Sequence, residues 1–233
     1  MVGINQNNII SLSGGKDSTA MLLMMLERNE PIHSVVFFDT GWEFPQMLEH
    51  IDHLEQHTGI KVVTLHPPHN FNDLLVKYGW PAFNRRWCTR EKIRVVSKYC
   101  KDNNGLELIG FAADEEKRTQ AKEFEKRNVR FPLIEWGITE ANALEYCKKH
   151  GFDWGGLYDH FDRVSCFCCP LKSSPEAWKK IRKYYPPQWK EMLRMDNTIS
   201  DNKGFYGYKT VNDLDRRFAD DDRQMEFDEV VNA

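Results

Sequence analysis

The chain has 233 residues, of which 41% are hydrophobic and 29% charged, and it carries a net charge of -3 with a pI near 6.3. This length favours one large domain, or one domain with an added lobe. The composition is that of a globular protein, and no apolar run is long enough to span a membrane, so we expect no membrane segment. The mild acidity gives the whole chain no electrostatic reason to bind nucleic acid.

The first eight residues contain no basic segment followed by an apolar one, so the sequence shows no secretory signal. We therefore expect a cytoplasmic protein in a reducing compartment. The six cysteines are not expected to form disulfides there.

Short β-rich runs alternate with helical segments over the first half of the chain. The predicted strands are residues 8–12, 32–38, 60–65 and 106–111, and the predicted helices are residues 20–26, 44–57, 71–78 and 91–100. Gly59 is a suitable residue to end the second helix, and Pro67 and Pro68 break the chain after the third strand. This alternation predicts a doubly wound, mainly parallel α/β sheet of the Rossmann-like kind, with its ligand site at the carboxyl ends of the strands.

Beyond Ala113 the pattern changes, and we expect the sheet to be complete by that point. A charged stretch, residues 114–130, precedes a helix at residues 139–150, and later residues are rich in aromatic side chains, glycine, proline and cysteine. The predicted domains are an α/β domain at residues 1–138 and a mainly helical extension at residues 139–233. The acidic tail, residues 213–233, is expected to be partly helical or frayed.

A glycine pair lies between the first predicted strand and the first helix. Glycine lets the backbone approach an anion, and the N-H groups at a helix N-terminus then point at it. Two serines add hydroxyl donors, a lysine adds charge, and Ser18 or Asp17 can also cap the helix. This segment, which we call the phosphate loop, consists of Ser13, Gly14, Gly15, Lys16, Asp17 and Ser18. Its spacing differs from a standard P-loop, and a capped turn without a ligand is the alternative.

The phosphate loop resembles the pyrophosphatase loop of the adenine nucleotide alpha-hydrolase superfamily, and later motifs resemble its phosphoadenosine phosphosulfate (PAPS) reductase-like family. Those motifs are Phe38-Asp39-Thr40-Gly41 with Glu43-Phe44-Pro45, Trp87-Cys88-Thr89 with Lys92, residues 110–118, Pro132-Leu133 with Trp136, Leu157-Tyr158, and Arg163-Val164-Ser165-Cys166 with Cys169-Pro170. The match covers most of residues 8–170. It departs from the family pattern at Ala112, where arginine is common.

The resemblance implies an enzyme that binds ATP with Mg²⁺ and cleaves it between the alpha and beta phosphates. The implied catalytic residues are Lys16, Asp17, Asp114, Glu115 and Arg118. The implied nucleotide-binding residues are the phosphate loop together with Asp39, Thr40, Gly41, Gly110 and Arg163. Without the neighbouring phosphate loop, Asp39 is equally well explained as the first residue of a turn. Without the resemblance, Arg118 is explained as part of a solvated charged face.

Two cysteines, Cys166 and Cys169, have the spacing at which both sulfurs reach one metal centre. Cys88 is the leading third ligand, because it immediately precedes a predicted helix and has arginine neighbours that favour the thiolate. Three thiolates suit a 4Fe-4S cluster with an open iron, whereas Cys168 as a fourth ligand would suit a closed cluster or zinc.

Other potential metal ligands are given structural roles. Cys100 and Cys147 lie in helical patterns and are expected to be buried as small hydrophobes. The histidines His50, His53 and His57 are expected on a solvated helix face, because no acidic or cysteine partner stands at a fixed spacing from them.

PAPS reductases resemble one another in a C-terminal Glu-Cys-Gly-x-His segment, and this sequence has no cysteine after Cys169. We therefore expect an ATP-dependent sulfurtransferase that forms AMP and pyrophosphate. The expected partners are a tRNA or DNA acceptor, a sulfur-donor protein and a second copy in a homodimer. The basic, aromatic segment at residues 172–190 is a candidate for binding nucleic acid, or else an amphipathic helix packed on the core. The alternatives are a PAPS or adenosine phosphosulfate reductase and a non-catalytic nucleotide-binding regulatory module.

Overall fold

The computed structural model describes residues 6–82, 84–164, 166–170, 172 and 174–231, with side chains described up to residue 225. Ser165 of the arginine-cysteine motif, residues 1–5 and the last two residues of the tail lie outside these ranges. Within them, no helix combines the length and apolarity needed to cross a bilayer.

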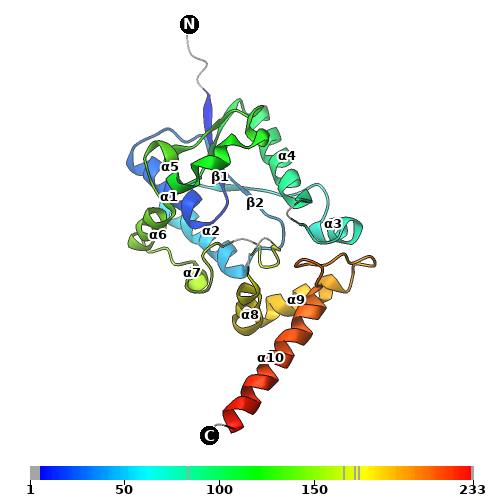
Figure 1. Cartoon of the computed structure of the whole chain (residues 1–233). Coiled ribbons are helices and arrows are strands. Elements are labelled where there is room, and N and C mark those ends of the chain that lie inside the picture. The colour runs from blue at the N-terminus through cyan, green and yellow to red at the C-terminus, as the bar shows by residue number, and fades with distance from the viewer. Residues whose placement is uncertain (1–5, 83, 165, 171, 173, 232–233) are drawn as a thin grey trace. The chain divides into compact units, whose positions relative to one another are not determined.

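The first half of the chain forms a parallel sheet of five strands in the order β3-β2-β1-β4-β5. The strands are β1 (Asn7–Leu12), β2 (Ser34–Phe38), β3 (Val62–Leu65), β4 (Gly105–Ile109) and β5 (Val129–Arg130). Figure 1 shows helices α1 (Lys16–Glu27), α5 (Pro132–Glu135) and α6 (Glu140–Lys149) on one side of the strands and α4 (Trp87–Asp102) on the other. The predicted doubly wound α/β fold is confirmed.

The core follows from the apolar runs seen in the sequence. Central strands of a parallel sheet are covered on both faces, so they are apolar throughout instead of alternating. Ile9, Ile10 and Leu12 of β1 are fully buried, and the helix α1 residues from Ala20 to Met25 are buried as well. Helix α2 (Pro45–Thr58) ends at Gly59, whose φ of 70° is left-handed, as the sequence predicted.

The structure corrects the expectation that the sheet ends before residue 113. The two-residue strand β5 extends it within the charged stretch, beside the short helices η1 (Ala113–Gln120) and η2 (Lys122–Phe124). Helix α4 begins at Trp87, so Cys88 lies inside its first turn instead of before it. The acidic tail forms one helix, α10 (Val211–Val231).

The chain folds into two compact units. The first contains residues 1–68 and 89–165, and the second contains residues 69–88 and 166–233. This division differs from the boundary expected at residue 138, because helix α6 and the short helices η3 (Trp154–Gly156) and α7 (Leu157–His160) belong to the first unit. The second unit combines α3 (Phe71–Tyr78) with α8 (Pro175–Tyr184), α9 (Pro186–Asp196) and α10.

Candidate nucleotide site

The phosphate loop joins the carboxyl end of β1 to the start of α1. Strands β1 and β4 are neighbours at the point where the strand order reverses, which is where ligands bind in open α/β sheets. The residue after β4 is Gly110. A Cβ atom there would lie 2.9 Å from the backbone N and Cα of Ser18. Glycine is therefore required for the end of β4 to approach the start of α1 so closely.

Hydrogen bonds within the loop fix its shape. The Ser18 hydroxyl accepts a bond from the Ser13 N-H at 3.1 Å and donates to the Gly15 carbonyl at 3.1 Å. Gly15 is the N-cap of α1, and no side chain caps the helix, which corrects the expected capping role of Ser18 or Asp17. Gly14 has a φ of 77°, and a Cβ atom there would meet the Met47 sulfur at 2.7 Å. Both the left-handed backbone and the lack of space for a side chain therefore favour glycine at position 14.

The side chain of Lys16 is buried at the start of α1. Its ammonium lies 3.1 Å from the Asp17 carboxylate and 3.5 Å from Glu140. Burial raises the pKa of Asp17, and the neighbouring Lys16 charge works in the opposite direction. Lys16 therefore balances acidic charge at the loop before any ligand is bound.

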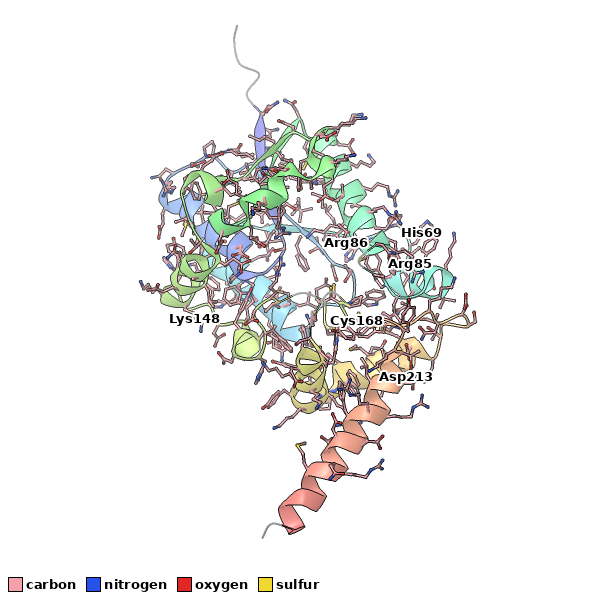
Figure 2. All side chains as sticks on the ribbon, in the orientation of Figure 1. His69, Arg85, Arg86, Lys148, Cys168 and Asp213 are labelled. Atoms are coloured by element: carbon pink, nitrogen blue, oxygen red, sulfur yellow. The ribbon has the colours of Figure 1, made fainter. Side chains whose placement is uncertain are left out.

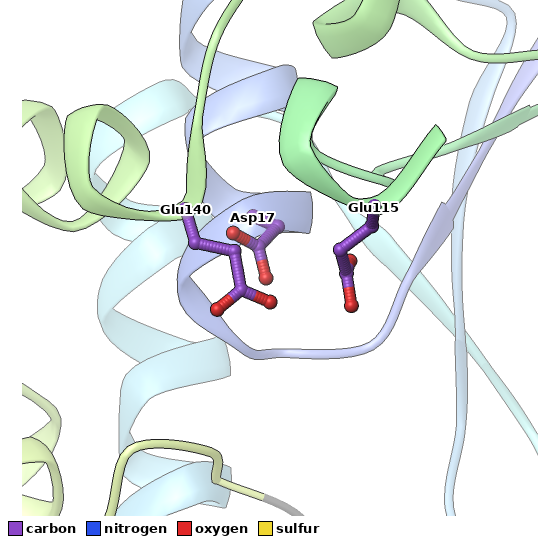
Figure 3. Close-up of side chains that lie close together, drawn as sticks. All are labelled: Asp17, Glu115 and Glu140. Atoms are coloured by element: carbon purple, nitrogen blue, oxygen red, sulfur yellow. The ribbon is translucent and has the colours of Figure 1, made fainter. Parts of the chain in front are cut away.

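Asp17, Glu115 and Glu140 offer carboxylate oxygens that all lie within 4.8 Å of one another. Figure 3 shows the three carboxylates turned toward the same space beside the loop from β1 to α1. Carboxylate oxygens are the ligands that Mg²⁺ prefers, so this set has the chemistry of a magnesium site. Glu140 was missed in the sequence because it starts a helix more than 120 residues away, and no local motif marks it.

Glu115 also binds two of the predicted arginines. The Arg118 guanidinium lies 2.5 Å from its carboxylate and is stacked on Phe111 at 3.9 Å from the ring centre, while Arg163 lies 3.6 Å from the same carboxylate. Together with Lys16, these give three cations among three carboxylates. Asp114 has a different place, since its carboxylate accepts the Glu140 backbone N-H at the start of α6.

The residues after β2 form a turn. The Asp39 carboxylate accepts the Gly41 N-H at 2.7 Å, which is the turn geometry expected of aspartate before Thr-Gly. The Thr40 hydroxyl donates to Glu43 at 2.8 Å. The pKa of Glu43 is raised to about 7. Burial is the largest cause, and a hydrogen bond with Asp39 is the second. A nucleotide-binding role for residues 39–41 stays a prediction.

A buried histidine lies behind the loop. His50 is 4% exposed, bonds the Thr19 hydroxyl through Nε2 at 2.9 Å and stacks on Trp154 with 4.6 Å between the ring centres. The expectation of a solvated face was therefore wrong for His50. The residue pattern alone had no signal for this, because the ring that covers His50 comes from a segment about 100 residues later.

The candidate metal cysteines all belong to the second unit, and Figure 2 labels Cys168 and the arginines Arg85 and Arg86 of that unit. The Cys169 N-H donates to the Cys166 carbonyl at 3.1 Å, so the Cys-x-x-Cys segment forms a tight turn. Cys168 is 1% exposed, whereas Cys88, Cys166 and Cys169 are half-buried. Cys100 and Cys147 are buried, as expected.

Zinc and a cluster make different demands on these thiols. Four ligands of one zinc ion, each about 2.3 Å from it, bring their atoms within about 4 Å of one another. Among the described residues, Asp17, Glu115 and Glu140 have ligand atoms within 4.8 Å of one another, whereas zinc on the cysteines stays a prediction. Thiolates that bind different irons of a cluster stand further apart, so the cluster stays a prediction.

The basic segment at residues 172–190 is largely folded into helices. Trp178 of α8 and Trp189 of α9 are buried, which corrects the idea that they stack on bases. Lys179 pairs with Asp221 at 2.7 Å, and Arg182 pairs with Asp215 and Asp222 of α10. The interpretation as an amphipathic helix that packs its aromatic side chains on the core agrees with the burial of Trp178 and Trp189.

The sequence of the chain matches a known family and several known proteins. The profile of the phosphoadenosine phosphosulfate reductase domain matches residues 7–172. An uncharacterized protein of Methanocaldococcus jannaschii is 29% identical over 195 residues, which cover 78% of this chain and 40% of that protein. Phosphoadenosine 5'-phosphosulfate reductase of Alkalilimnicola ehrlichii is 23% identical over 167 residues, 64% of each. The chain thus spans less than two thirds of the length of these curated relatives.

Two solved structures are also similar. The U34-tRNA thiolase NcsA of Methanococcus maripaludis, solved with its [4Fe-4S] cluster, has a TM-score of 0.49 at 17% identity, covering 83% of this chain and 73% of that one. The NH3-dependent NAD synthetase of Campylobacter jejuni has a TM-score of 0.47 at 11% identity, covering 86% of each chain. The family profile covers well over half of the sequence and includes the phosphate loop, so the chain belongs to the phosphoadenosine phosphosulfate reductase domain family.

Proposed function

We propose that this protein is an ATP pyrophosphatase that adenylates an acceptor and transfers sulfur to it, releasing AMP and pyrophosphate. The observation that carries the proposal is the phosphate loop at the reversal point of the sheet, with Lys16 and three carboxylates beside it. Backbone N-H groups and an ammonium bind phosphate oxygens, while carboxylates hold the divalent ion that accompanies a nucleotide. This arrangement supports binding of ATP together with Mg²⁺.

Charge pairing explains why the ion is needed. Lys16, Arg118 and Arg163 each lie within 4 Å of one of the three carboxylates. Free ATP must compete with these carboxylates for the same cations. When Mg²⁺ takes the carboxylates, the cations are released to the phosphates, so ATP and the ion bind more strongly together than apart.

The proposed reaction has two substitution steps. An acceptor oxygen attacks the alpha phosphorus, the bond to the beta-phosphate oxygen breaks, and pyrophosphate leaves with the bonding electrons. A sulfide sulfur then attacks the acceptor atom that carries the AMP group, the bond from that atom to the AMP-linked oxygen breaks, and AMP leaves with that oxygen and the bonding electrons. Lys16 and the loop N-H groups stabilise the charge that develops on the leaving pyrophosphate, and Mg²⁺ supplies further positive charge.

The acceptor and the sulfur source are further parts of the proposal. We propose a nucleic acid acceptor, tRNA or DNA, a sulfur-donor protein and a 4Fe-4S cluster on Cys88, Cys166 and Cys169, with zinc as the alternative metal. The placement of all three cysteines in one compact unit supports the shared site. No step of the reaction above depends on the cluster.

Pyrophosphate release tests the proposal. The protein is incubated with ATP, Mg²⁺, sulfide and total tRNA or plasmid DNA, and labelled AMP and pyrophosphate are measured in equal amounts if it is right. Formation of ADP and phosphate, or no turnover with either acceptor, contradicts it. Release of sulfite from PAPS in the presence of thioredoxin supports the reductase alternative, and nucleotide binding without any turnover supports a regulatory module.

A further inference from the structure

A segment far along the chain contacts the phosphate loop at two points. The Trp154 indole Nε1 donates to the Gly14 carbonyl at 2.7 Å, and the Tyr158 hydroxyl accepts the Lys16 N-H at 2.8 Å. The two rings pack edge to face, with 4.7 Å between their centres. One contact therefore uses a carbonyl of the loop, and the other uses an N-H group.

Trp154 is held firmly in this position. It has a φ of 54°, which is uncommon for a bulky residue, and the two glycines that follow are also left-handed. His50 stacks on its ring and is itself bonded to Thr19 of α1. Burial lowers the pKa of His50 to about 3, so the ring behind the tryptophan stays neutral. Such a conformation persists only where its surroundings fix it.

The Tyr158 hydroxyl accepts a hydrogen bond from the Lys16 N-H, a group that a bound phosphate would also use. Lys16 is the first residue of α1, and its N-H has no partner within the helix. An N-H makes one strong hydrogen bond, so an anion at this N-terminus and the tyrosine hydroxyl compete for it. The Gly14 carbonyl, by contrast, repels anions, so Trp154 does not compete with a ligand.

We propose that the Tyr158 hydroxyl fills a phosphate-oxygen position in the empty loop and leaves it when a phosphate binds, whereas Trp154 holds Gly14 in place throughout. The inference rests on the proposed function, because it concerns the same loop. Burial raises the pKa of Tyr158, so the hydroxyl that leaves is neutral near pH 7. Two neighbouring aromatic residues thus have opposite effects on affinity.

Two conservative variants test these opposite effects. Tyr158→Phe removes the competing hydroxyl and is expected to bind magnesium pyrophosphate and ATP roughly two- to tenfold more tightly, the range expected for one hydrogen bond. Trp154→Phe keeps a ring but loses the donor to Gly14, so its affinity is expected to fall by a similar factor. Tyr146→Phe on α6 is the control, since no hydrogen bond links its hydroxyl to the loop among the described residues. Affinity is measured by calorimetry, and folding by thermal denaturation.

The outcomes separate this inference from the proposed function. If the wild type binds ATP but Tyr158→Phe binds it equally or more weakly, the tyrosine serves the ligand instead of competing with it, and the inference is wrong while the function stands. If neither protein binds pyrophosphate or ATP, both are wrong. A crystal structure of the wild-type pyrophosphate complex gives a second test that needs no variant. A Tyr158 hydroxyl still bonded to the Lys16 N-H in that complex overturns the inference.

Discussion

Lys16 carries the charge balance of the nucleotide site. Its side chain is 6% exposed and lies between Asp17 and Glu140, so it is held in place before a ligand arrives. A buried ammonium is a stronger partner for phosphate than an exposed one, because water competes less for it. The same burial means that its removal leaves two carboxylates without their cation.

We predict that Lys16→Ala weakens ATP binding by about 10- to 100-fold, the range expected for a charged hydrogen bond. Lys148→Ala removes an exposed lysine from α6 and serves as the control. Both variants are compared by calorimetry in the presence of Mg²⁺. Equal affinity in the two variants would exclude the phosphate loop as the ATP site.

Glu43 gives the turn after β2 a dependence on pH. The folded protein holds the Glu43 proton up to a pKa of about 7, whereas the unfolded chain releases it near the ordinary value of 4.5. The folded protein therefore binds more protons between these values, and stability falls as the pH rises through this window. The loss is on the order of 3 kcal/mol for a shift of this size.

The matching prediction concerns Glu43→Gln, which imitates the protonated side chain. Its free energy of unfolding is expected to fall less than that of the wild type between pH 4.5 and pH 7. Urea unfolding at a series of pH values measures both curves. Parallel curves for the two proteins would show that Glu43 is ionised in the fold.

At the scale of elements, the sequence was most informative where one chain segment decides the structure. Buried strands such as β1 and the apolar helix α1 were predicted within a few residues, because burial on both faces leaves a continuous apolar run. Strand β5 was missed, since two residues in a charged stretch carry no periodic pattern.

The candidate site shows the same limit. The phosphate loop is local and has a recognisable order of residues, so its place between strand and helix was predicted. Glu140, Tyr158 and Trp154 reach the loop only through the folding of distant segments onto α1. Leu157-Tyr158 stood out as a family-like motif, but nothing in the sequence specified that its hydroxyl contacts the loop, and only three-dimensional packing reveals these contacts.

Ion pairs link helix α10 to α8, in addition to the buried apolar residues Val211, Leu214 and Phe218 of α10. Arg182 binds Asp215 and Asp222, and the Trp189 indole also donates to Asp215 at 2.7 Å. Partly exposed ion pairs contribute little singly, so we predict that Arg182→Met destabilises the docking of α10 by about 0.5–1 kcal/mol. Cleavage within residues 211–231 by a dilute protease should then rise roughly two- to fivefold, and more at low salt than at high salt.

Arg194→Met is the matched control for this prediction. Arg194 pairs with Glu191 on its own helix, so its loss leaves α10 untouched. Mass spectrometry of the early fragments identifies the cleavage sites. If the two variants are cleaved at α10 at the same rate, the charged contacts do not hold that helix.

At the scale of the whole molecule, the two kinds of candidate chemistry belong to different units. The phosphate loop and the three carboxylates lie in the first unit, and Cys88, Cys166, Cys168 and Cys169 lie in the second. The cysteine site can therefore be tested by metal content without reference to turnover, and nucleotide binding can be tested without the metal. Each result stands whatever the other shows.

The cysteine prediction is the most consequential at this scale. We expect protein purified without oxygen to contain iron and acid-labile sulfide in near-equal amounts and to absorb visible light, because three thiolates suit a 4Fe-4S cluster. Cys88→Ser, Cys166→Ser and Cys169→Ser are each expected to lose most of the iron. Cys100→Ser is the control, since Cys100 is buried within the first unit and burial raises its pKa to about 12.

Cys168→Ser decides the ligand number: retained iron indicates an open cluster, and lost iron indicates a closed one. Zinc in place of iron supports the alternative metal, while full iron in Cys88→Ser shows that this thiol is no ligand.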